Sequence, residues 1–269
     1  MPGPWVGLGA LLAVLAAPAA PAAEEAPPAG VVTAAPAASG ADALAPLVSL
    51  YQPNYLIAGP EDSPVVGDLT TKFQLSLKFD VGAHWYLAYT QRLYWDVTRH
   101  SQPIVDLSLQ PELFYVWRLA PNVAERLDLQ TTQLGLEHES NGKDGAASRS
   151  WNRAYVEPHF RWGGWFLEPR VWAILSEDEQ NPDIADYYGY FDLRLGYEGA
   201  DGQRFTFTGR HGSAHGSAQL DMALPMRALF AGNGMRPWLY AQAWAGYGET
   251  LLYYNVYTRA FRIGIEFHP

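Results

Sequence analysis

Residues 71–80 read Thr-Lys-Phe-Gln-Leu-Ser-Leu-Lys-Phe-Asp, and they show the alternation of this chain most clearly. Its apolar residues Phe73, Leu75, Leu77 and Phe79 are separated by single polar residues. A period of two places the apolar side chains on one face of a β-strand and the polar side chains on the other. The pattern therefore predicts a strand that separates an apolar environment from a polar one.

The same alternation returns from about residue 49 onward, where no segment has a clean helical period. It is clear again from Tyr187 to Tyr197 and from Phe261 to Phe267. Each segment has about ten residues, the length that a tilted strand needs to cross a bilayer. We expect strands near residues 49–59, 70–80, 84–97, 105–118, 125–138, 151–162, 165–176, 186–198, 203–213, 216–227, 236–246 and 257–267. About twelve strands, an even number, suit an all-β fold that forms a single transmembrane antiparallel β-barrel.

A soluble β-sandwich would show the same alternation, so the membrane interpretation depends on two further features. Aromatic residues stand at the expected strand ends, where Trp and Tyr prefer the headgroup level of a bilayer. These residues are Trp85, Trp95, Trp117, Trp162, Trp165, Tyr197 and Trp238. Charged residues such as Glu157, His159 and Arg170 lie deep within strands on the polar face. A barrel lumen can pair such charges, and one so crowded is expected to be filled rather than an open pore.

The composition agrees with a strand-built membrane protein. Only 17% of the 269 residues are charged and 14% are aromatic, and no long apolar run is present outside the N-terminus. The net charge of −10 argues against a nucleic-acid partner, because such a chain cannot neutralise phosphates. Cysteine is absent, which excludes disulfides and thiolate metal sites.

The N-terminus is typical of an exported protein. Residues 5–17 form an apolar core that is too short to span a bilayer as a helix, and alanine-rich sequence follows it. Residues 1–23 are therefore expected to be a signal peptide, although a disordered tail is the alternative because no Lys or Arg precedes Lys72. The Ala/Pro-rich residues 24–45 are expected to be a flexible leader, and residues 46–269 the barrel domain.

His138, Ser140 and Asn152 form the candidate catalytic site. A histidine, a serine and an asparagine are the parts of a serine hydrolase in which Asn replaces the usual carboxylate. His138 and Ser140 share their strand face with Leu134 and Leu136, so they are expected to point away from the lumen. Asn152 has the corresponding apolar parity on the next strand. A reactive group there meets membrane lipid, although polar residues that merely reach the headgroups are the alternative.

Gln91 is a polar residue in the middle of another row of side chains expected to face outward, from Trp85 to Trp95. An amide that faces acyl chains without a partner costs several kcal/mol. Either a bulge changes the face at Gln91, or the side chain finds a partner on another chain. The second possibility predicts dimerisation through this face.

At these residues the chain resembles the outer membrane phospholipase A family of Gram-negative bacteria. The matching stretches are His138-x-Ser140-Asn141-Gly142, Ser148-Arg149-Ser150-Trp151-Asn152-Arg153, Asn181-Pro182-Asp183-Ile184, Tyr188-Gly189-Tyr190, Ala88-Tyr89-Thr90-Gln91, Gly246-Tyr247-Gly248-Glu249 and Asn54-Tyr55-Leu56-Ile57. The resemblance covers residues 50 to 267. It implies a 12-stranded barrel in the bacterial outer membrane.

The resemblance also implies roles for the site residues. Ser140 would be the nucleophile, His138 the general base and Asn152 the group that holds the imidazole. The backbone N–H of Gly142 and a bound Ca²⁺ would stabilise the oxyanion. Gln91 matches a glutamine that is buried when family members dimerise and become active.

The calcium ligands implied by the family are the Ser148 hydroxyl, the Lys143 carbonyl and, from the partner subunit of a homodimer, the Ser101 hydroxyl. Such a shell suits Ca²⁺, but without a carboxylate it would bind weakly. The family often has an Asp where this chain has Gly145. Whether Asp144 substitutes for it is open.

The expected function is calcium-dependent hydrolysis of acyl esters in membrane glycerophospholipids, with phospholipase A1, A2 and lysophospholipase activity. One alternative is a lipopolysaccharide deacylase, since such a barrel can also use an outward His-x-Ser pair. The other is a non-catalytic structural or channel barrel.

Overall fold

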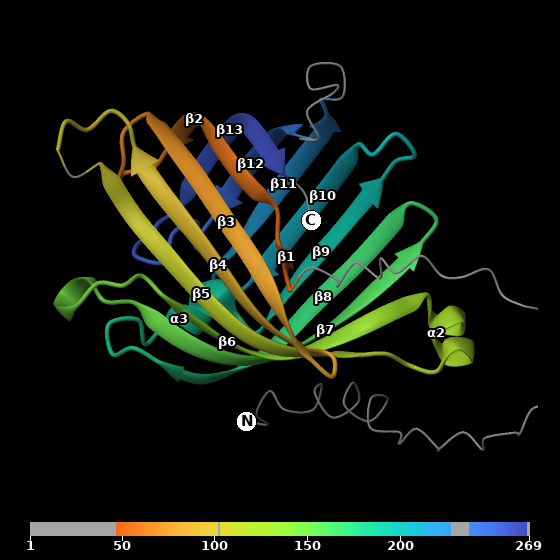
Figure 1. Ribbon diagram of the computed structural model, residues 1–269. Coiled ribbons are helices and arrows are strands. Elements are labelled where there is room, and N and C mark those ends of the chain that lie inside the picture. The colour runs from red at the N-terminus through yellow and green to blue at the C-terminus, as the bar shows by residue number, and fades with distance from the viewer. Residues whose placement is uncertain (1–46, 102, 227–236, 268–269) are drawn as a thin grey trace, which may run out of the picture. The chain divides into compact units, whose positions relative to one another are not determined.

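The computed structural model describes residues 47–101, 103–226 and 237–267, and Figure 1 shows how their strands are arranged. The expected signal peptide at residues 1–23 and the leader at 24–45 lie outside the described residues. The elements in chain order are β1 Val48–Leu50, β2 Asn54–Asp62, β3 Leu69–Gly82, β4 Trp85–Asp96, β5 Ile104–Trp117, α2 Pro121–Leu127, β6 Leu129–Ser140, a 3₁₀ turn Gly145–Ala147, β7 Ser150–Trp162, β8 Trp165–Glu177, α3 Ile184–Tyr188, β9 Phe191–Glu198, β10 Arg204–His211, β11 Gly216–Pro225, β12 Trp238–Gly246 and β13 Thr258–Phe267.

The strands form one closed antiparallel barrel. From β3 to β13 each strand pairs with its neighbours in sequence, and β2 pairs with both β3 and β13, which closes the ring. The barrel wall has twelve strands, although thirteen β segments are present. The reason is that β1 and β2 pair with the same edge of β3 and are two parts of one strand. The all-β, 12-stranded prediction is confirmed.

The first strand is interrupted at residues 51–53, where the sequence predicted an unbroken segment. Pro53 has no N–H to donate to the ladder. Asn54 bridges the gap instead, since its side chain donates to the Ser76 carbonyl (3.1 Å) and accepts from the Ser76 N–H (2.7 Å).

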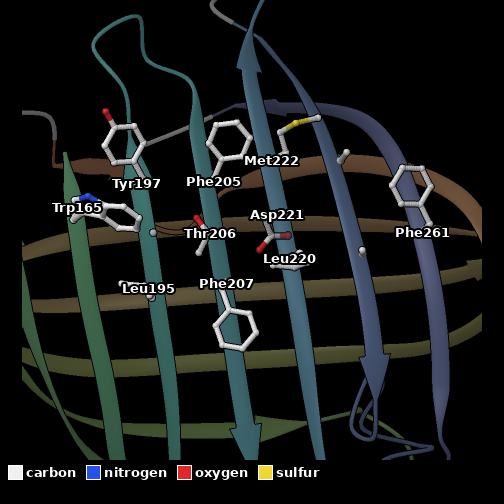
Figure 2. A pocket seen from close by; sticks show the side chains of 13 residues that line it. Trp165, Leu195, Tyr197, Phe205, Thr206, Phe207, Leu220, Asp221, Met222 and Phe261 are labelled. Atoms are coloured by element: carbon white, nitrogen blue, oxygen red, sulfur yellow. The ribbon is translucent and has the colours of Figure 1, made fainter.

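The two faces of the barrel wall follow the alternation that the sequence predicted. On β3, Lys72, Gln74 and Ser76 are buried in the lumen, whereas Leu75 on the opposite face is 38% exposed. The outer face is apolar. Figure 2 shows it over β9 to β13, where Tyr197, Phe205, Phe207, Leu220, Met222 and Phe261 line a shallow groove of about 650 Å³.

Trp residues mark the strand ends, as predicted. Trp85 begins β4 and is 43% exposed, and Trp165 begins β8 and is 46% exposed. Trp162 pairs with Trp165 across the tight Gly163-Gly164 turn. Exposed indoles at these heights suit the interface between lipid and water.

The lumen holds the charges that a sandwich core could not. His159 lies 3.1 Å from a Glu157 oxygen and 3.3 Å from a Glu168 oxygen. Arg170 is paired with Glu157 and, at 2.8 Å, with Glu137. A second cluster joins Lys72 (3.1 Å) and Arg262 (2.9 Å) to Glu249. A polar cavity of about 210 Å³ remains between these groups.

The sequence missed two short helices. Helix α2 (121–127) precedes β6, so the strand expected from residue 125 begins at Leu129. Pro121, whose fixed φ suits the first turn, opens α2, and Asp128 closes it with a left-handed φ of 52°. Helix α3 (184–188) likewise delays the strand expected from residue 186 until Phe191.

The alternation of Tyr187, Gly189 and Phe191 was therefore not a strand pattern along its whole length. The N–H of Gly189 closes the α3 turn on the Ala185 carbonyl (3.0 Å). Tyr188 packs instead in a buried cluster with Trp151 and Trp172. Among the described residues, no helix has the length and apolar character to cross a membrane.

Candidate active site

His138 and Asn152 face each other across the β6–β7 pair. They are register partners, and His138 Nδ1 lies 2.9 Å from Asn152 Oδ1. An amide oxygen only accepts, so Nδ1 is the donor in this contact, and in a neutral ring Nε2 is the nitrogen that carries a lone pair. The neighbours Glu137 and Glu139 are buried in the lumen, which places His138 on the outer face.

Ser176 of β8 lies opposite Asn152 and extends the row that His138 and Asn152 form across the strands. The sequence analysis did not identify it. Asn152 Nδ2 donates to Ser176 Oγ at 2.8 Å. The amide therefore has its nitrogen on the β8 side and its oxygen on the histidine side. The serine hydroxyl fixes the orientation of the Asn152 side chain that the histidine needs.

Ser140 lies on the same outward face as His138, at the end of β6. Its register partners are Ser150 on β7 and Leu109 on β5, and its side chain is half-buried. No hydrogen bond from Ser140 to the His138 ring occurs within the described residues. Catalytic hydrogen bonds are often long without substrate and shorten when substrate binds.

The loop after Ser140 is folded around Asn141, a buried residue to which the sequence analysis gave no role. Its side chain donates to the Ala147 carbonyl (2.8 Å) and accepts from the backbone N–H groups of Arg149 (3.0 Å) and Lys143 (3.3 Å). Gly142 follows with φ of 66°, a left-handed conformation that favours glycine. Asn141 therefore sets the shape of the segment that carries Gly142 and Lys143.

Ser148 ends this loop and contacts an acidic residue of another loop. Its hydroxyl donates to Asp178 Oδ2 at 2.7 Å. The other oxygen, Oδ1, accepts from the Gln180 N–H at 2.8 Å. Hydrogen bonds from Gln180 and Ser148 lower the pKa of the Asp178 carboxyl, so it is ionised at neutral pH.

The oxygen groups around Ser148 fit the calcium ion that the sequence implied. A hydroxyl beside an ionised carboxylate is an oxygen-only set of the kind that Ca²⁺ prefers. Within the described residues no three His, Asp or Glu side chains converge on a point. Lys143 is exposed on the same loop, and Ser101 is exposed on the β4–β5 loop at the same end of the barrel.

Gln91 lies on the outer face, as its parity predicted. The register of β4 with β5 is continuous from Trp85 to Tyr94, so no bulge changes the face at Gln91. Tyr89, on the same face, donates its hydroxyl to Gln91 Oε1 at 3.0 Å. One of the two alternatives, a slip of parity, is therefore wrong.

The family model described as Phospholipase A1 matches residues 46–267. Phospholipase A1 of Escherichia coli (strain K12) is 32% identical over 209 residues, which cover 72% of this chain and 68% of that protein. Phospholipase A1 of Salmonella typhimurium is 31% identical with the same coverage.

Two solved structures are similar over most of the chain. Outer membrane phospholipase A from Escherichia coli has a TM-score of 0.70 at 28% identity, covering 82% of this chain and 98% of that one. The Salmonella typhi outer membrane phospholipase, described as a dimer with bound calcium, has a TM-score of 0.69 at 27% identity. It covers 82% of this chain and 92% of that chain.

Proposed function

This chain belongs to the phospholipase A1 family, and on that premise we propose that Ser140, His138 and Asn152 hydrolyse acyl esters of glycerophospholipids. The protein is a phospholipase of the bacterial outer membrane. The observation that carries the assignment to these three residues is the 2.9 Å contact of His138 with Asn152 on the outer face, beside Ser140.

In the proposed mechanism Ser140 Oγ attacks the ester carbonyl carbon while His138 Nε2 takes its proton. Asn152 accepts from Nδ1 and keeps the ring in the tautomer that leaves Nε2 basic. The imidazolium then protonates the departing glycerol oxygen, and an acyl-enzyme remains. Water, deprotonated by His138, releases the fatty acid and restores Ser140.

The oxyanion is stabilised in this proposal by the backbone N–H of Gly142. Its left-handed φ of 66° turns the chain directly after Ser140 and Asn141. A calcium ion held by Ser148, Lys143 and the partner's Ser101 would polarise the ester carbonyl when bound. The homodimer and the calcium dependence are supported by the Salmonella typhi structure, which is a calcium-bound dimer.

The substrate class follows from the position of the site. Leu136, two residues from His138 on the same face, is 53% exposed, so apolar wall lies next to the reacting groups. Acyl chains of a bilayer lipid cover such a wall, with the ester bonds at the height of the strand ends. The phospholipase family favours phospholipid over the lipopolysaccharide deacylase and over a non-catalytic barrel.

Residues 1–23 fit this proposal as a signal peptide that directs export, and residues 24–45 as a flexible leader. The family match begins at residue 46, where the expected barrel domain begins. N-terminal sequencing of the protein from outer membranes would test the cleavage site.

Substitution of the proposed nucleophile tests the function. Ser140→Ala should reduce fatty-acid release from phospholipid micelles in calcium by roughly 10⁴-fold or more. The barrel should stay folded, as judged by heat-modifiable gel mobility, because Ser140 lies on the outer face and its side chain makes no hydrogen bond to a lumenal group among the described residues. Hydrolysis at the wild-type rate would exclude Ser140 as the nucleophile.

A further inference from the structure

The calcium ligands proposed above bring no negative charge. They are two hydroxyls and one backbone carbonyl, from Ser101, Ser148 and Lys143. Neutral oxygens alone bind Ca²⁺ weakly in proteins, because affinity rises with the number of carboxylates. A carboxylate beside this set would change that, and the described residues place one there.

We propose that Asp178 is the carboxylate of the calcium site, where it orients the Ser148 hydroxyl and supplies negative charge beside the cation. The inference rests on the proposed function, because it assumes that calcium binds at Ser148. The supporting contact is the 2.7 Å hydrogen bond from Ser148 Oγ to Asp178 Oδ2.

The direction of this hydrogen bond matters for a cation. A serine hydroxyl has one proton and two lone pairs. Because the proton is donated to Asp178, the lone pairs of Ser148 point away from that bond and are available to a metal. A ligand held by an outer carboxylate in this way is oriented and made more basic.

Asp178 is held in place by the chain around it. Its own N–H donates to the Ser150 carbonyl at 2.8 Å. Asn181, which is 0% exposed, fastens the same loop to Ser150 through two hydrogen bonds of 3.1 Å. Ser150 is two residues from Ser148, so the carboxylate and the hydroxyl are fixed on one framework.

The Asp178 carboxylate forms no ion pair with another described residue. Among the described residues, no Lys, Arg or His nitrogen lies within ion-pair distance of its carboxylate. The neighbouring Arg149 directs its guanidinium to the carbonyls of Ala146 (3.1 Å) and Ser148 (2.6 Å). Arg149 attracts the carboxylate only from beyond ion-pair distance, so no direct ion pair competes with a cation at Ser148.

Asp144 is the competing carboxylate, and the sequence left its role open. It is exposed, and it makes no side-chain hydrogen bond at the N-terminus of the 3₁₀ turn. Asp178, by contrast, contacts Ser148 directly. The two candidates can be separated by substituting each one alone.

The test is calcium binding by the full-length protein refolded in detergent micelles, measured by calorimetric titration and by displacement of Tb³⁺ luminescence. Asp178→Asn should weaken calcium affinity by roughly 10- to 100-fold. Asp178→Glu should recover part of that loss, which a merely structural role would not produce. Glu179→Gln removes the same charge from an exposed neighbour and is the matched control, with Asp144→Asn as the second comparison.

Unchanged calcium affinity in Asp178→Asn, or an equal loss in Glu179→Gln, would overturn the inference. A loss confined to Asp144→Asn would overturn it in favour of Asp144. Phospholipid hydrolysis, assayed on the same samples at saturating calcium, reports separately on the proposed function. If the wild-type enzyme is active but calcium binding does not depend on Asp178, only this inference is refuted. If calcium binding depends on Asp178 but the wild-type protein is inactive, only the proposed function is refuted.

Discussion

Gln91 and Ser140 lie in one row across the barrel wall, because both are register partners of Leu109 on β5. Gln91 pairs with Leu109 from β4, and Ser140 pairs with Leu109 from β6. A second subunit that packs on Gln91 therefore stands directly beside the proposed nucleophile. In the proposed homodimer, this arrangement lets the partner subunit complete the substrate cleft.

Gln91→Ala should weaken dimerisation. Loss of a hydrogen bond between membrane segments costs about 1 kcal/mol, or roughly a fivefold change in the dimer constant. Sedimentation in detergent with calcium and a sulfonyl fluoride inhibitor would measure it. Leu220→Ala, on the outer face of β11, is the control. Dimerisation equal to wild type in Gln91→Ala would remove this residue from the interface.

Ser176→Ala should lower kcat without changing the barrel. The amide of Asn152 loses the 2.8 Å contact that fixes its orientation, a cost of about 1 kcal/mol and so roughly fivefold in rate. If Ser176 acts through Asn152, its substitution should have no further effect in an Asn152→Ala background. Additive losses in the double mutant would show that Ser176 acts in another way.

Asn141→Ala should deform the loop that carries Gly142. It removes the acceptor for the N–H groups of Lys143 and Arg149 and the donor to Ala147. Buried groups left without partners cost about 1–3 kcal/mol each. We expect faster amide exchange in residues 142–149 and reduced activity with a normal barrel. Protection equal to wild type would contradict this role.

Removal of calcium should abolish hydrolysis reversibly. The oxygen ligands proposed here allow the irregular coordination of Ca²⁺ but not the compact octahedron that Mg²⁺ requires. Activity lost to a chelator should return with Ca²⁺ and not with Mg²⁺ at equal concentration. Circular dichroism should not change during the cycle, since no lumenal ion pair among the described residues involves the loop 141–149 that carries Lys143 and Ser148. Activity that survives chelation would refute the calcium dependence.

Arg170→Met should destabilise the barrel. It leaves Glu157 and Glu137 in the lumen without their shared cation, and breaking a buried pair costs roughly 3–5 kcal/mol. Urea unfolding in lipid vesicles would measure the loss. Arg161→Gln, at an exposed pair with Glu198, should cost much less. Equal effects of the two substitutions would mean that burial of the pair is unimportant.

Much of this architecture was predictable from the sequence. The polar and apolar residues of β3 alternate strictly, and together with the aromatic strand ends and the charges deep within strands this alternation predicted a wall between lumen and lipid. The same parity placed His138, Ser140 and Asn152 on the outer face correctly. The helices α2 and α3 were missed, because each is a single turn or two of chain without a repeating apolar face.

Ser176 was not predictable for a different reason. If the pairing that begins with Trp162 and Trp165 continued along both strands without interruption, Leu175 would lie opposite Asn152. A bulge between Asn152 and Arg153 shifts the register, so Ser176 takes that place. No residue pattern in the two strands signals this bulge. Asp178 was missed similarly, since a loop far along the chain is brought to Ser148 only by the closed pairing of β7 with β8.

The end of β8 has one further consequence. Ser176 contacts Asn152, Asp178 contacts Ser148 and Asn181 contacts Ser150, all from a single short segment. Metal binding and the alignment of the histidine are then two properties of one piece of chain. By thermodynamic reciprocity, an inhibitor that fixes the histidine ring should increase the affinity for the metal by a certain factor. The metal should increase the affinity for the inhibitor by the same factor.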